Sequence, residues 1–486
     1  MLGIFYLFGL VLAALSGAMA TPSLVAAAHQ EYELVPIFLI SAALLAFIAG
    51  GLIFALRGTE RRLKRYEALV LCVMLWTLVP LFAAVPLYLS SHLATPFDAY
   101  FESVSGFTTT GVTLLNAMET VPRALLFWRG MLEWLGGAAT LLMLLLVFAP
   151  AHIGGTPDRP LRSVETGART SRMRIIGTAG RVLPLYAGLT GMCFLMLAAA
   201  GLSPLQSVGL AFSAVSTGGF NVTGQSLENQ SIFAQAVVTL FMFVGATSIV
   251  WQRALATRRW QAARQHRESY WLLLSIMVVA LLFAYGFYKG ADGSVGLQPA
   301  DAVWTGLVSA VSIISTTGIE VREGGFAALA LPLLLVLVLV GGGGFSTAGG
   351  IRLFRIGAMA LQAKRELNRL VHPHGVRSAR IGSQDYDLQM LKAVWVSFLA
   401  FVAAVSIGTL GLAVAGVSFE ASLIAIVANL ANAGAIYTGL GASVPFWISY
   451  AEMGTGAQAI LVLMMIVGRM EVLGVLALFN LYFWRS

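Results

Sequence analysis

Four short stretches of this chain share one pattern: residues 101–113 read FESVSGFTTTGVT, 210–222 read LAFSAVSTGGFNV, 308–320 read VSAVSIISTTGIE and 427–437 read VANLANAGAIY. In each stretch a short apolar run ends in small residues and a glycine. Aligned on that glycine, the centres are Gly111, Gly219, Gly318 and Gly434, which are 108, 99 and 116 residues apart. Each stretch lies between two longer hydrophobic runs. The spacing therefore predicts four copies of one unit: helix, half-helix, extended glycine segment, helix.

The composition is that of a membrane protein. Hydrophobic residues make up 58% of the 486 residues and charged residues only 11%, against a charged share of about a quarter in soluble domains. Apolar runs near the length needed to cross a bilayer, about 20 residues, recur along the chain. The clearest are 36–56, 68–89, 131–150, 271–288, 329–342, 394–414 and 460–483. They lack the polar face of a helix in a large soluble protein, so we predict a polytopic membrane protein.

The N-terminus has two possible interpretations. Residues 2–15 are apolar and are followed by SGAMA at 16–20, which resembles the cleavage site of a secretory signal. The stretch has no basic residue before its apolar run. We therefore favour a retained first transmembrane helix, with a signal peptide as the weaker alternative.

The basic residues predict how the chain is oriented, because Lys and Arg concentrate in cytoplasmic loops. Most of them fall in four clusters: Arg57, Arg61, Arg62, Lys64, Arg65; Arg159, Arg162, Arg169, Arg172, Arg174, Arg181; Arg253, Arg258, Arg259, Arg264, Arg267; and Arg352, Arg355, Lys364, Arg365, Arg369, Arg377, Arg380. The segments 21–34, 90–124, 200–233, 289–325 and 416–456 are acidic and poor in basic residues. We expect both termini to be cytoplasmic. The net charge of +8 then reflects membrane orientation and anionic lipid, with no nucleic-acid partner.

The four glycine stretches, all on the predicted outer side, point to an ion pore. Non-helical backbone at membrane depth is tolerated only where it is buried in protein or lines a watery cavity. Four such segments around an axis would supply rings of carbonyl oxygens, which can replace the hydration shell of a potassium ion. Glycine permits the unusual backbone angles and keeps the axis clear. Threonine hydroxyls can add ligands or brace the turns, at Thr108, Thr109, Thr110, Thr217, Thr316 and Thr317.

Glu320 follows the third glycine directly. Its negative charge at the mouth of such a pore would raise the local concentration of cations. A single Thr-Thr-Gly is more often a surface loop, but four such stretches at comparable spacing favour the pore.

The predicted fold class is an all-α polytopic membrane protein with an N-terminal transmembrane helix pair (1–60). Four helix–pore-loop–helix repeats around a central ion pore follow it (61–155, 156–268, 269–370 and 371–486).

A glycine-rich loop follows the third stretch. Residues 341–350 read GGGGFSTAGG, with six glycines in ten residues, which interrupts any helix. A break deep in the membrane, within the third repeat, suits a flexible gate beneath the filter. Close packing of small residues between helices is the alternative. We favour the gate, because ten such residues exceed what packing requires.

Two charged residues lie inside apolar runs, where a charge costs about 2.5–3.5 kcal/mol on insertion scales. Arg469 is expected to face the pore below the filter, to pair with Glu471 or a loop carbonyl, or to do both. Glu133 is expected to be structural and not to carry ions.

Two other classes of function are weaker. A secondary carrier for a small solute would use broken helices at the midplane and inverted repeats, whereas these repeats share one orientation. An enzyme would need a catalytic constellation, and the six histidines form no HExxH motif. We therefore expect no enzymatic activity.

The residues that carry these features resemble the Trk/Ktr/HKT superfamily of potassium transport proteins, in its TrkH-like bacterial branch. The resembling motifs are residues 98–111, 128–137, 216–220, 315–318, 343–350 with Arg352, and 468–471. The resemblance implies uptake of potassium as the transported ion, channel-like or by proton symport, across the bacterial inner membrane. It also implies a homodimer regulated by a separate cytoplasmic nucleotide-binding subunit of the TrkA type.

The same resemblance assigns the site residues. The potassium filter would use Thr110, Gly111, Gly218, Gly219, Thr317, Gly318, Ala433 and Gly434. The gate would use Gly343, Gly344, Ser346, Thr347, Gly349, Gly350 and Arg469. The fourth stretch departs from the Asn-x-Gly-Pro-Gly pattern of this branch, because Ala435, Ile436 and Tyr437 follow its glycine. We expect Tyr437 to crowd the outer mouth.

Overall fold

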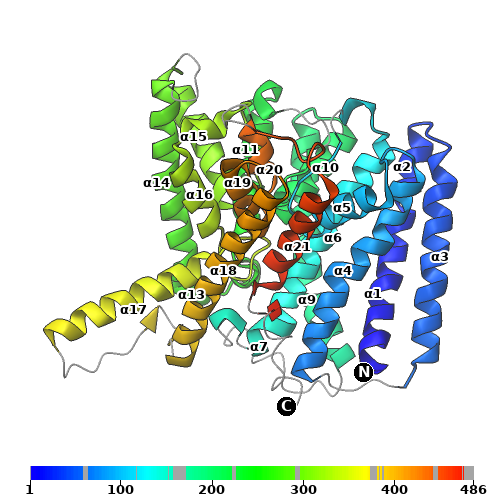
Figure 1. Ribbon diagram of the computed structural model, residues 1–486, viewed down its shortest axis with the longest axis horizontal. Helices are drawn as coiled ribbons and strands as arrows, with labels where there is room; N and C mark the ends of the chain where they lie inside the picture. Colours follow the sequence, from blue (N-terminus) through cyan, green and yellow to red (C-terminus); the bar gives the residue numbers. More distant parts are fainter. Residues whose placement is uncertain are drawn as a thin grey trace.

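The computed structural model describes residues 2–58, 64–115, 118–151, 153–156, 171–221, 226–290, 296–372, 380–381, 384–385, 388–441, 447–472 and 474–475. Arg61, Arg62, Arg159, Arg162, Arg169 and Arg377 of the basic clusters lie outside these residues. The described chain is almost wholly helical (Figure 1), which confirms the predicted all-α class. Its strands are β1 (Arg380–Ile381) and β2 (Gln384–Asp385), which pair antiparallel.

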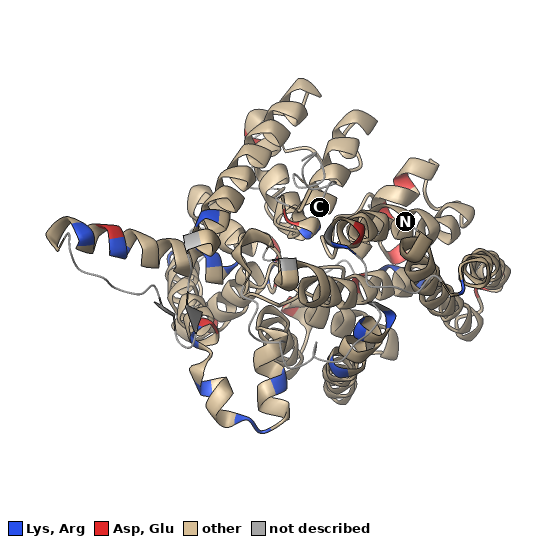
Figure 2. Cartoon of the chain, turned by 90° about the horizontal axis from the view of Figure 1, so that it is seen from below, with Lys and Arg blue, Asp and Glu red and all other residues tan. Residues whose placement is uncertain are grey.

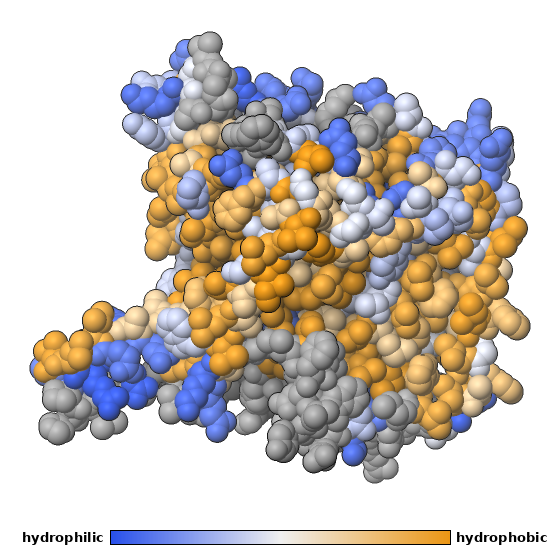
Figure 3. All heavy atoms as spheres, viewed as in Figure 1, coloured by the Kyte–Doolittle hydropathy of each residue, from blue (hydrophilic) through white to orange (hydrophobic). Residues whose placement is uncertain are grey.

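Seven helices of the described residues are long and apolar enough to cross a membrane, or up to eight if one bent pair counts as a span. Their apolar side chains form a broad hydrophobic band between hydrophilic ends (Figure 3), as a bilayer requires. The long helices are α1 (Leu2–Ala20) continuing into α2 (Pro22–Ala28), α3 (Leu34–Ala55), α4 (Arg65–Leu89), α6 (Arg123–Met143), α9 (Ser171–Ala199), α14 (Arg267–Lys289) and α18 (Leu388–Val414). The bent pair is α11 (Ile232–Ala246) and α12 (Ile249–Ala256), which meet at 108°.

Shorter helices lie between these spans. Four of them come directly before the glycines of the four stretches: α5 (Pro96–Phe107), α10 (Pro204–Ser216), α15 (Pro299–Ile314) and α19 (Phe419–Leu430). The others are α7 (Ala149–Ala151), α13 (Trp260–Gln265), α16 (Leu331–Val340), α17 (Leu353–Val371), α20 (Ala435–Gly439) and α21 (Thr455–Met470). Single helical turns occur at η1 (Met118–Thr120), η3 (Ile153–Gly155), η4 (Leu227–Asn229) and η5 (Gly325–Ala328), and a π-helical turn, η2 (Leu144–Phe148), extends α6.

The N-terminal helices form a separate pair at the edge of the molecule (Figure 1), where α1 packs along α3. The Ser16 hydroxyl donates to the Ala42 carbonyl at 2.8 Å. Gly9 permits the close approach, since a Cβ there would lie 3.1 Å from Leu52. In the rest of the chain the four short helices pack against their neighbours: α5 against α4 and α6, α10 against α6, α9 and α11, α15 against α14 and α11, and α19 against α18 and α21.

One expected span is shorter than predicted and another is interrupted. The run 329–342 contains only the ten-residue α16, because Gly341 takes a positive φ of +64° and ends the helix. In the run 460–483, α21 ends at Met470 and Glu471 takes a positive φ of +53°, and residues 473 and 476–483 lie outside those that the structure describes. Hydrophobicity alone did not reveal either break.

Helix α17 extends from the body of the molecule as an arm (Figure 1). It bears basic residues, visible from below in Figure 2, and the apolar side chains of Leu367, Leu370 and Val371, which are 65%, 82% and 71% exposed. A soluble monomer rarely leaves such residues uncovered together. The arm therefore needs lipid or another protein to cover it.

Candidate functional site

The four short helices begin with similar caps. Thr95, Ser203 and Ser418 accept a hydrogen bond from the backbone N–H three residues later. A proline occupies the first helical position of α5, α10 and α15. Hydroxyl caps and an initial proline are both typical of helix N-termini. Each of the four helices thus begins with a hydroxyl cap, an initial proline or both. All four begin in the acidic segments that the sequence places on the outer side.

The four helices also end in the same way. A left-handed residue terminates each one: Thr109 (φ +51°), Thr217 (+54°), Thr316 (+61°) and Asn432 (+51°). The next N–H then bonds the carbonyl five residues earlier, at 2.8–3.0 Å, as in a Schellman motif. These bonds run from Thr110 to Ser105, from Gly218 to Ser213, from Thr317 to Ser312 and from Ala433 to Ala428. The sequence repeat is thus also a repeat of backbone geometry.

After these turns, the backbone has the same conformation at the glycine in three of the four stretches. Gly111, Gly219 and Gly318 have φ of +75°, +95° and +73°, values that side-chain-bearing residues rarely adopt. Gly434 is different, because its φ is −61° and the chain turns directly into α20. We refer to residues 109–112, 217–220, 316–319 and 432–435 as the first to fourth glycine segments.

A serine stands six residues before each of the first three glycines but not before the fourth. The Ser105 hydroxyl donates to the Val112 carbonyl at 2.6 Å, and the Ser312 hydroxyl donates to the Ile319 carbonyl at 2.7 Å. Ser213 instead accepts from the Gly219 N–H at 2.8 Å. The equivalent residue of the fourth stretch is Ala428, which has no hydroxyl. Sequence analysis overlooked these serines, although their constant spacing from the glycines was visible.

The four glycine segments meet in a closed ring. A Cβ added to Gly111 would overlap the Gly218 carbonyl, and one added to Gly219 would overlap the Thr317 carbonyl. A Cβ on Gly318 would lie 2.8 Å from Ala435, and one on Gly434 would lie 3.1 Å from the Thr110 carbonyl. The first segment thus contacts the second, the second the third, the third the fourth and the fourth the first. All eight residues assigned to the filter lie in this ring.

The fourth segment is held from outside by aromatic residues. Tyr437 is fully buried, with its ring centroid 4.7 Å from that of Tyr450 and 5.8 Å from that of Trp447. Its hydroxyl donates to the Ile448 carbonyl at 2.8 Å. The expectation that Tyr437 crowds the mouth is therefore wrong, because the turn into α20 carries its ring into the protein. Tyr450 in turn donates to the Gly434 carbonyl at 3.3 Å.

The glycine-rich loop lies against the ends of three of the four short helices. Thr347 Oγ1 lies 3.2 Å from the Val215 carbonyl and 3.2 Å from the Thr217 hydroxyl, and it bonds the Gly245 carbonyl at 3.0 Å. The Gly349 N–H donates to the Thr316 hydroxyl at 2.9 Å. A Cβ on Gly349 would overlap the Ala431 carbonyl. The loop therefore contacts the second, third and fourth units directly.

Arg469 connects the loop to the first unit. It is 1% exposed, its Nε donates to the Thr108 carbonyl at 2.5 Å and its Nη1 donates to the Thr347 carbonyl at 2.6 Å. Its Nη2 bonds the Thr109 hydroxyl. No ion pair joins it to a carboxylate among the described residues. Of the expected alternatives, the bond to a loop carbonyl is present and the pair with Glu471 is absent.

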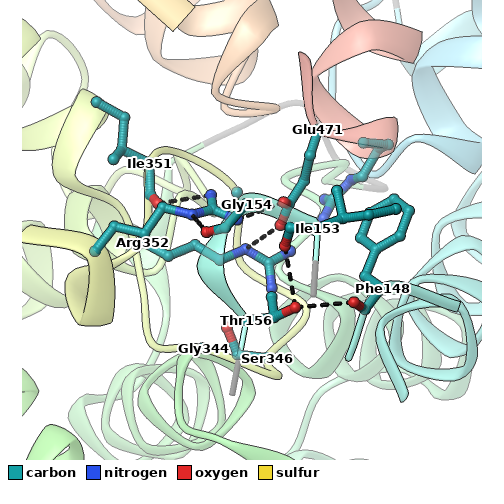
Figure 4. Close-up of polar contacts among 12 residues, drawn as sticks. Phe148, Ile153, Gly154, Thr156, Gly344, Ser346, Ile351, Arg352 and Glu471 are labelled. Carbon is teal, nitrogen blue, oxygen red and sulfur yellow. Dashed lines mark hydrogen bonds and ion pairs between the residues drawn. The ribbon is translucent and has the colours of Figure 1, made fainter. Parts of the chain in front are cut away.

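Glu471 instead binds the far end of the loop (Figure 4). It forms ion pairs with Arg355 and, at 3.9 Å, with Arg352, and all three side chains are buried. Arg355 also donates to the Gly154 carbonyl at 2.8 Å and the Ile351 carbonyl at 3.0 Å. These contacts tie the loop to the end of α21 and to the turn after α6.

The other end of the loop is fixed as well. The Gly343 N–H donates to the Ala246 carbonyl at 2.9 Å, and the Gly344 N–H donates to the Glu268 carboxylate at 2.5 Å. Ser346 closes a turn within the loop by donating to the Gly343 carbonyl at 2.6 Å. The seven residues assigned to the gate are therefore brought together, with both ends anchored and the middle beneath the ring.

Glu320 lies just past the third segment and is partly buried. Its Oε2 accepts from the Gly324 N–H at 3.4 Å, and its buried Oε1 has no partner. Burial raises its pKa from the ordinary 4.5 to about 8. Its surroundings thus favour the protonated form, which weakens the negative charge that the sequence suggested at this position.

These features define a helical membrane protein in which the glycine segments after four short helices form a ring beside an anchored glycine-rich loop. The family model for TrkH, a cation transport protein, matches residues 36–483. The chain belongs to this family, which confirms the resemblance. Because it is a family of transport proteins, the expectation that the chain is not an enzyme is also confirmed.

Similar proteins cover the whole chain. The Trk system potassium uptake protein TrkH of Vibrio parahaemolyticus is 30% identical, over 98% of each chain. The TrkH protein of Escherichia coli strain K12 is 28% identical, again over 98% of each. The crystal structure of the potassium transporter TrkH from Vibrio parahaemolyticus matches with a TM-score of 0.83 and 26% identity. The match covers 100% of this chain and 99% of that one.

We predict that Glu320→Gln flattens the pH dependence of thermal stability. The folded protein holds this proton up to about pH 8, whereas an unfolded chain releases it near 4.5. The stability from this group is therefore complete below the lower value and is lost as the pH rises through the higher one. Between about pH 5.5 and about pH 8.5, the apparent melting temperature of the wild type in detergent should fall more than that of the variant. Glu323→Gln, at an exposed neighbour, should keep most of the slope, and equal slopes for wild type and Glu320→Gln would contradict the assignment.

Proposed function

We propose that this protein takes up potassium ions through the centre of the ring formed by the four glycine segments. The observation that carries the proposal is the closed ring itself, in which four helix ends of similar turn geometry bring irregular backbone together among the apolar helices. Such backbone is stable in a membrane only where it is buried or lines a cavity. The relatives named above are potassium uptake proteins, which supports potassium as the ion.

The ion ligands in this proposal are backbone carbonyls of the paired residues in each segment: Thr110 and Gly111, Gly218 and Gly219, Thr317 and Gly318, and Ala433 and Gly434. Carbonyls can replace the hydration shell of potassium. In the fourth segment Ala433 has the larger role, because Tyr450 already donates to the Gly434 carbonyl. The membrane potential drives entry, at about 2.3 kcal/mol per charge per 100 mV.

The gate in this proposal is the loop 341–350. Its middle contacts the inner ends of the ring through Thr347 and Gly349, and Arg469 places a positive charge at the same point. An arginine beneath a filter raises the electrostatic barrier for a cation. Opening requires the loop to exchange these hydrogen bonds for others while its anchored ends remain in place.

Orientation and partners follow from the charged surfaces. Figure 2 shows basic residues on the face seen from below, and the sequence gathers most Lys and Arg into four clusters, so we place this face in the bacterial cytoplasm with both termini. This face would bind a nucleotide-binding regulatory subunit of the TrkA type. The α17 arm, with Leu367, Leu370 and Val371 exposed, would pack against a second copy of the chain in a homodimer.

We predict that Gly111→Ser lowers selectivity for potassium over sodium by about tenfold, because a left-handed residue with a side chain costs about 1–2 kcal/mol. The added atoms would also displace the second segment at the Gly218 carbonyl. The measurement is growth of a potassium-uptake-deficient bacterium at limiting potassium, with and without sodium. Gly201→Ser is the matched control, because Gly201 has a φ of +90° but no neighbour within 4 Å of an added Cβ. If both variants behave like the wild type, Gly111 is not in the filter.

We also predict that Thr347→Val increases rubidium flux in liposomes without the regulatory subunit. The change keeps the shape of the side chain but removes its bonds to the second unit, each worth about 0.5–1.5 kcal/mol. Two such bonds correspond to a rise of about tenfold in the open fraction. Thr239→Val is the control, because the Thr239 hydroxyl bonds the Gln235 carbonyl within its own helix, α11, and does not contact the loop. Unchanged flux from folded Thr347→Val protein would show that the loop is not the barrier.

A further inference from the structure

Glu133 on α6 lies directly behind the second glycine segment. Its side chain is fully buried, and its Oε1 accepts a hydrogen bond from the Phe220 N–H at 2.9 Å. Its Oε2 is buried and makes no hydrogen bond of ordinary geometry, although the Ser213 hydroxyl lies beside the carboxylate. A Cβ added to Gly218 would lie 2.6 Å from each carboxylate oxygen. The carboxylate therefore occupies the space where a side chain at position 218 would lie.

The first and third segments fill this space differently. There the equivalent residues are Thr110 and Thr317, which pair with a hydroxyl two residues earlier: Thr110 with Thr108 at 2.7 Å and Thr317 with Ser315 at 2.7 Å. Each pair links the segment to the last turn of its own helix. We call each hydroxyl pair a brace, because it joins a glycine segment to its own helix without a residue from another helix.

The second segment has lost this brace. Position 218 is glycine, and Ser216, the residue equivalent to Thr108 and Ser315, has a buried hydroxyl with no hydrogen-bond partner. The only carboxylate oxygen bonded to this segment's backbone among the described residues comes from Glu133. The absent threonine, the unpartnered Ser216 hydroxyl and the Glu133 carboxylate thus occur together behind the second segment.

A second α6 residue holds Phe220 from its other side. The Arg129 guanidinium lies 4.1 Å from the centroid of the Phe220 ring and pairs with Glu102 at 3.3 Å. Glu102 accepts from the Leu114 N–H at 2.9 Å, just beyond the first segment. Helix α6 thus links the outer ends of the first and second segments through Arg129 and Glu133, which are one turn apart.

We propose that Glu133 is a positioning residue for ion selectivity, which holds the second segment in place of the hydroxyl pair used by the first and third. The proposal rests on the proposed pore function. Glu133 contacts the backbone of the segment and not the ion. Its contribution is an acceptor oxygen at the Phe220 N–H, and its charge is not required for that contribution.

The test is the ratio of rubidium to sodium flux in proteoliposomes. Glu133→Gln keeps an acceptor oxygen at the same reach, so its ratio should stay within about twofold of the wild type. Glu133→Asp keeps the charge but is one methylene too short, so its ratio should fall by about tenfold, the effect of losing one buried hydrogen bond. The opposite order, with Glu133→Asp selective and Glu133→Gln not, would overturn the proposal in favour of a charge effect.

A compensating variant tests directly whether a hydroxyl pair can replace Glu133 behind the second segment. Glu133→Ala alone should lose selectivity about tenfold. Adding Gly218→Thr should restore most of it, because the introduced hydroxyl can pair with Ser216 in the space that the carboxylate leaves. Adding Ser216→Ala to that double variant should remove the rescue. If the double variant folds and stays unselective, the two braces are not equivalent and the proposal fails.

The controls separate this proposal from the proposed function. Gln235→Ala removes a buried polar side chain from α11, whose bonds go to the Leu227 and Gln230 carbonyls and to Trp304, away from the filter residues. It should leave the flux ratio unchanged. If folded wild-type protein passes no rubidium, the pore function itself fails. If the wild type is selective and Glu133→Ala is equally selective, only the role of Glu133 is overturned.

Discussion

The structure depends on one constraint: backbone that leaves a helix inside a membrane must find its hydrogen bonds within the protein. The four short helices meet this constraint with the same turn, a left-handed residue followed by an N–H that bonds the carbonyl five residues earlier. At each turn the backbone leaves the helix and changes direction. Because the four turns are alike, the residues that follow them meet as a ring, and glycine is needed where a side chain would overlap the neighbouring backbone.

The ring has only approximate fourfold symmetry, and each departure comes with a compensating contact. The fourth segment has Ala428 where the first and third have a serine that bonds the segment, Ser105 and Ser312. It turns into α20 and is held by a hydrogen bond from Tyr450. The second segment lacks the threonine hydroxyl and is held by Glu133. Arg469 joins the first unit to the loop that contacts the other three. The buried charges in this region thus bond mainly to backbone, and their arrangement determines where the irregular segments lie.

Much of this was predictable from sequence, because glycines at nearly constant spacing and apolar runs are direct signals of repeat and membrane architecture. The helical class, the family and the position of the helix break before Arg352 all follow from them. Contacts between distant segments were not predictable. Nothing near Arg469 in the sequence indicates that it bonds Thr108 while Glu471 binds Arg355. Similarly, the burial of Tyr437 and Glu320 depends on the turn into α20 and on the Gly324 contact, which no local pattern encodes.

The central claim is that the four glycine segments bind the transported ion, and the most direct test is to locate that ion. Crystals grown in rubidium and measured at the rubidium absorption edge would give an anomalous map of its positions. The account predicts density on the axis of the ring, between the backbones of residues 110–111, 218–219, 317–318 and 433–434. Density at a buried carboxylate such as Glu133 or Glu268, with an empty ring, would contradict it.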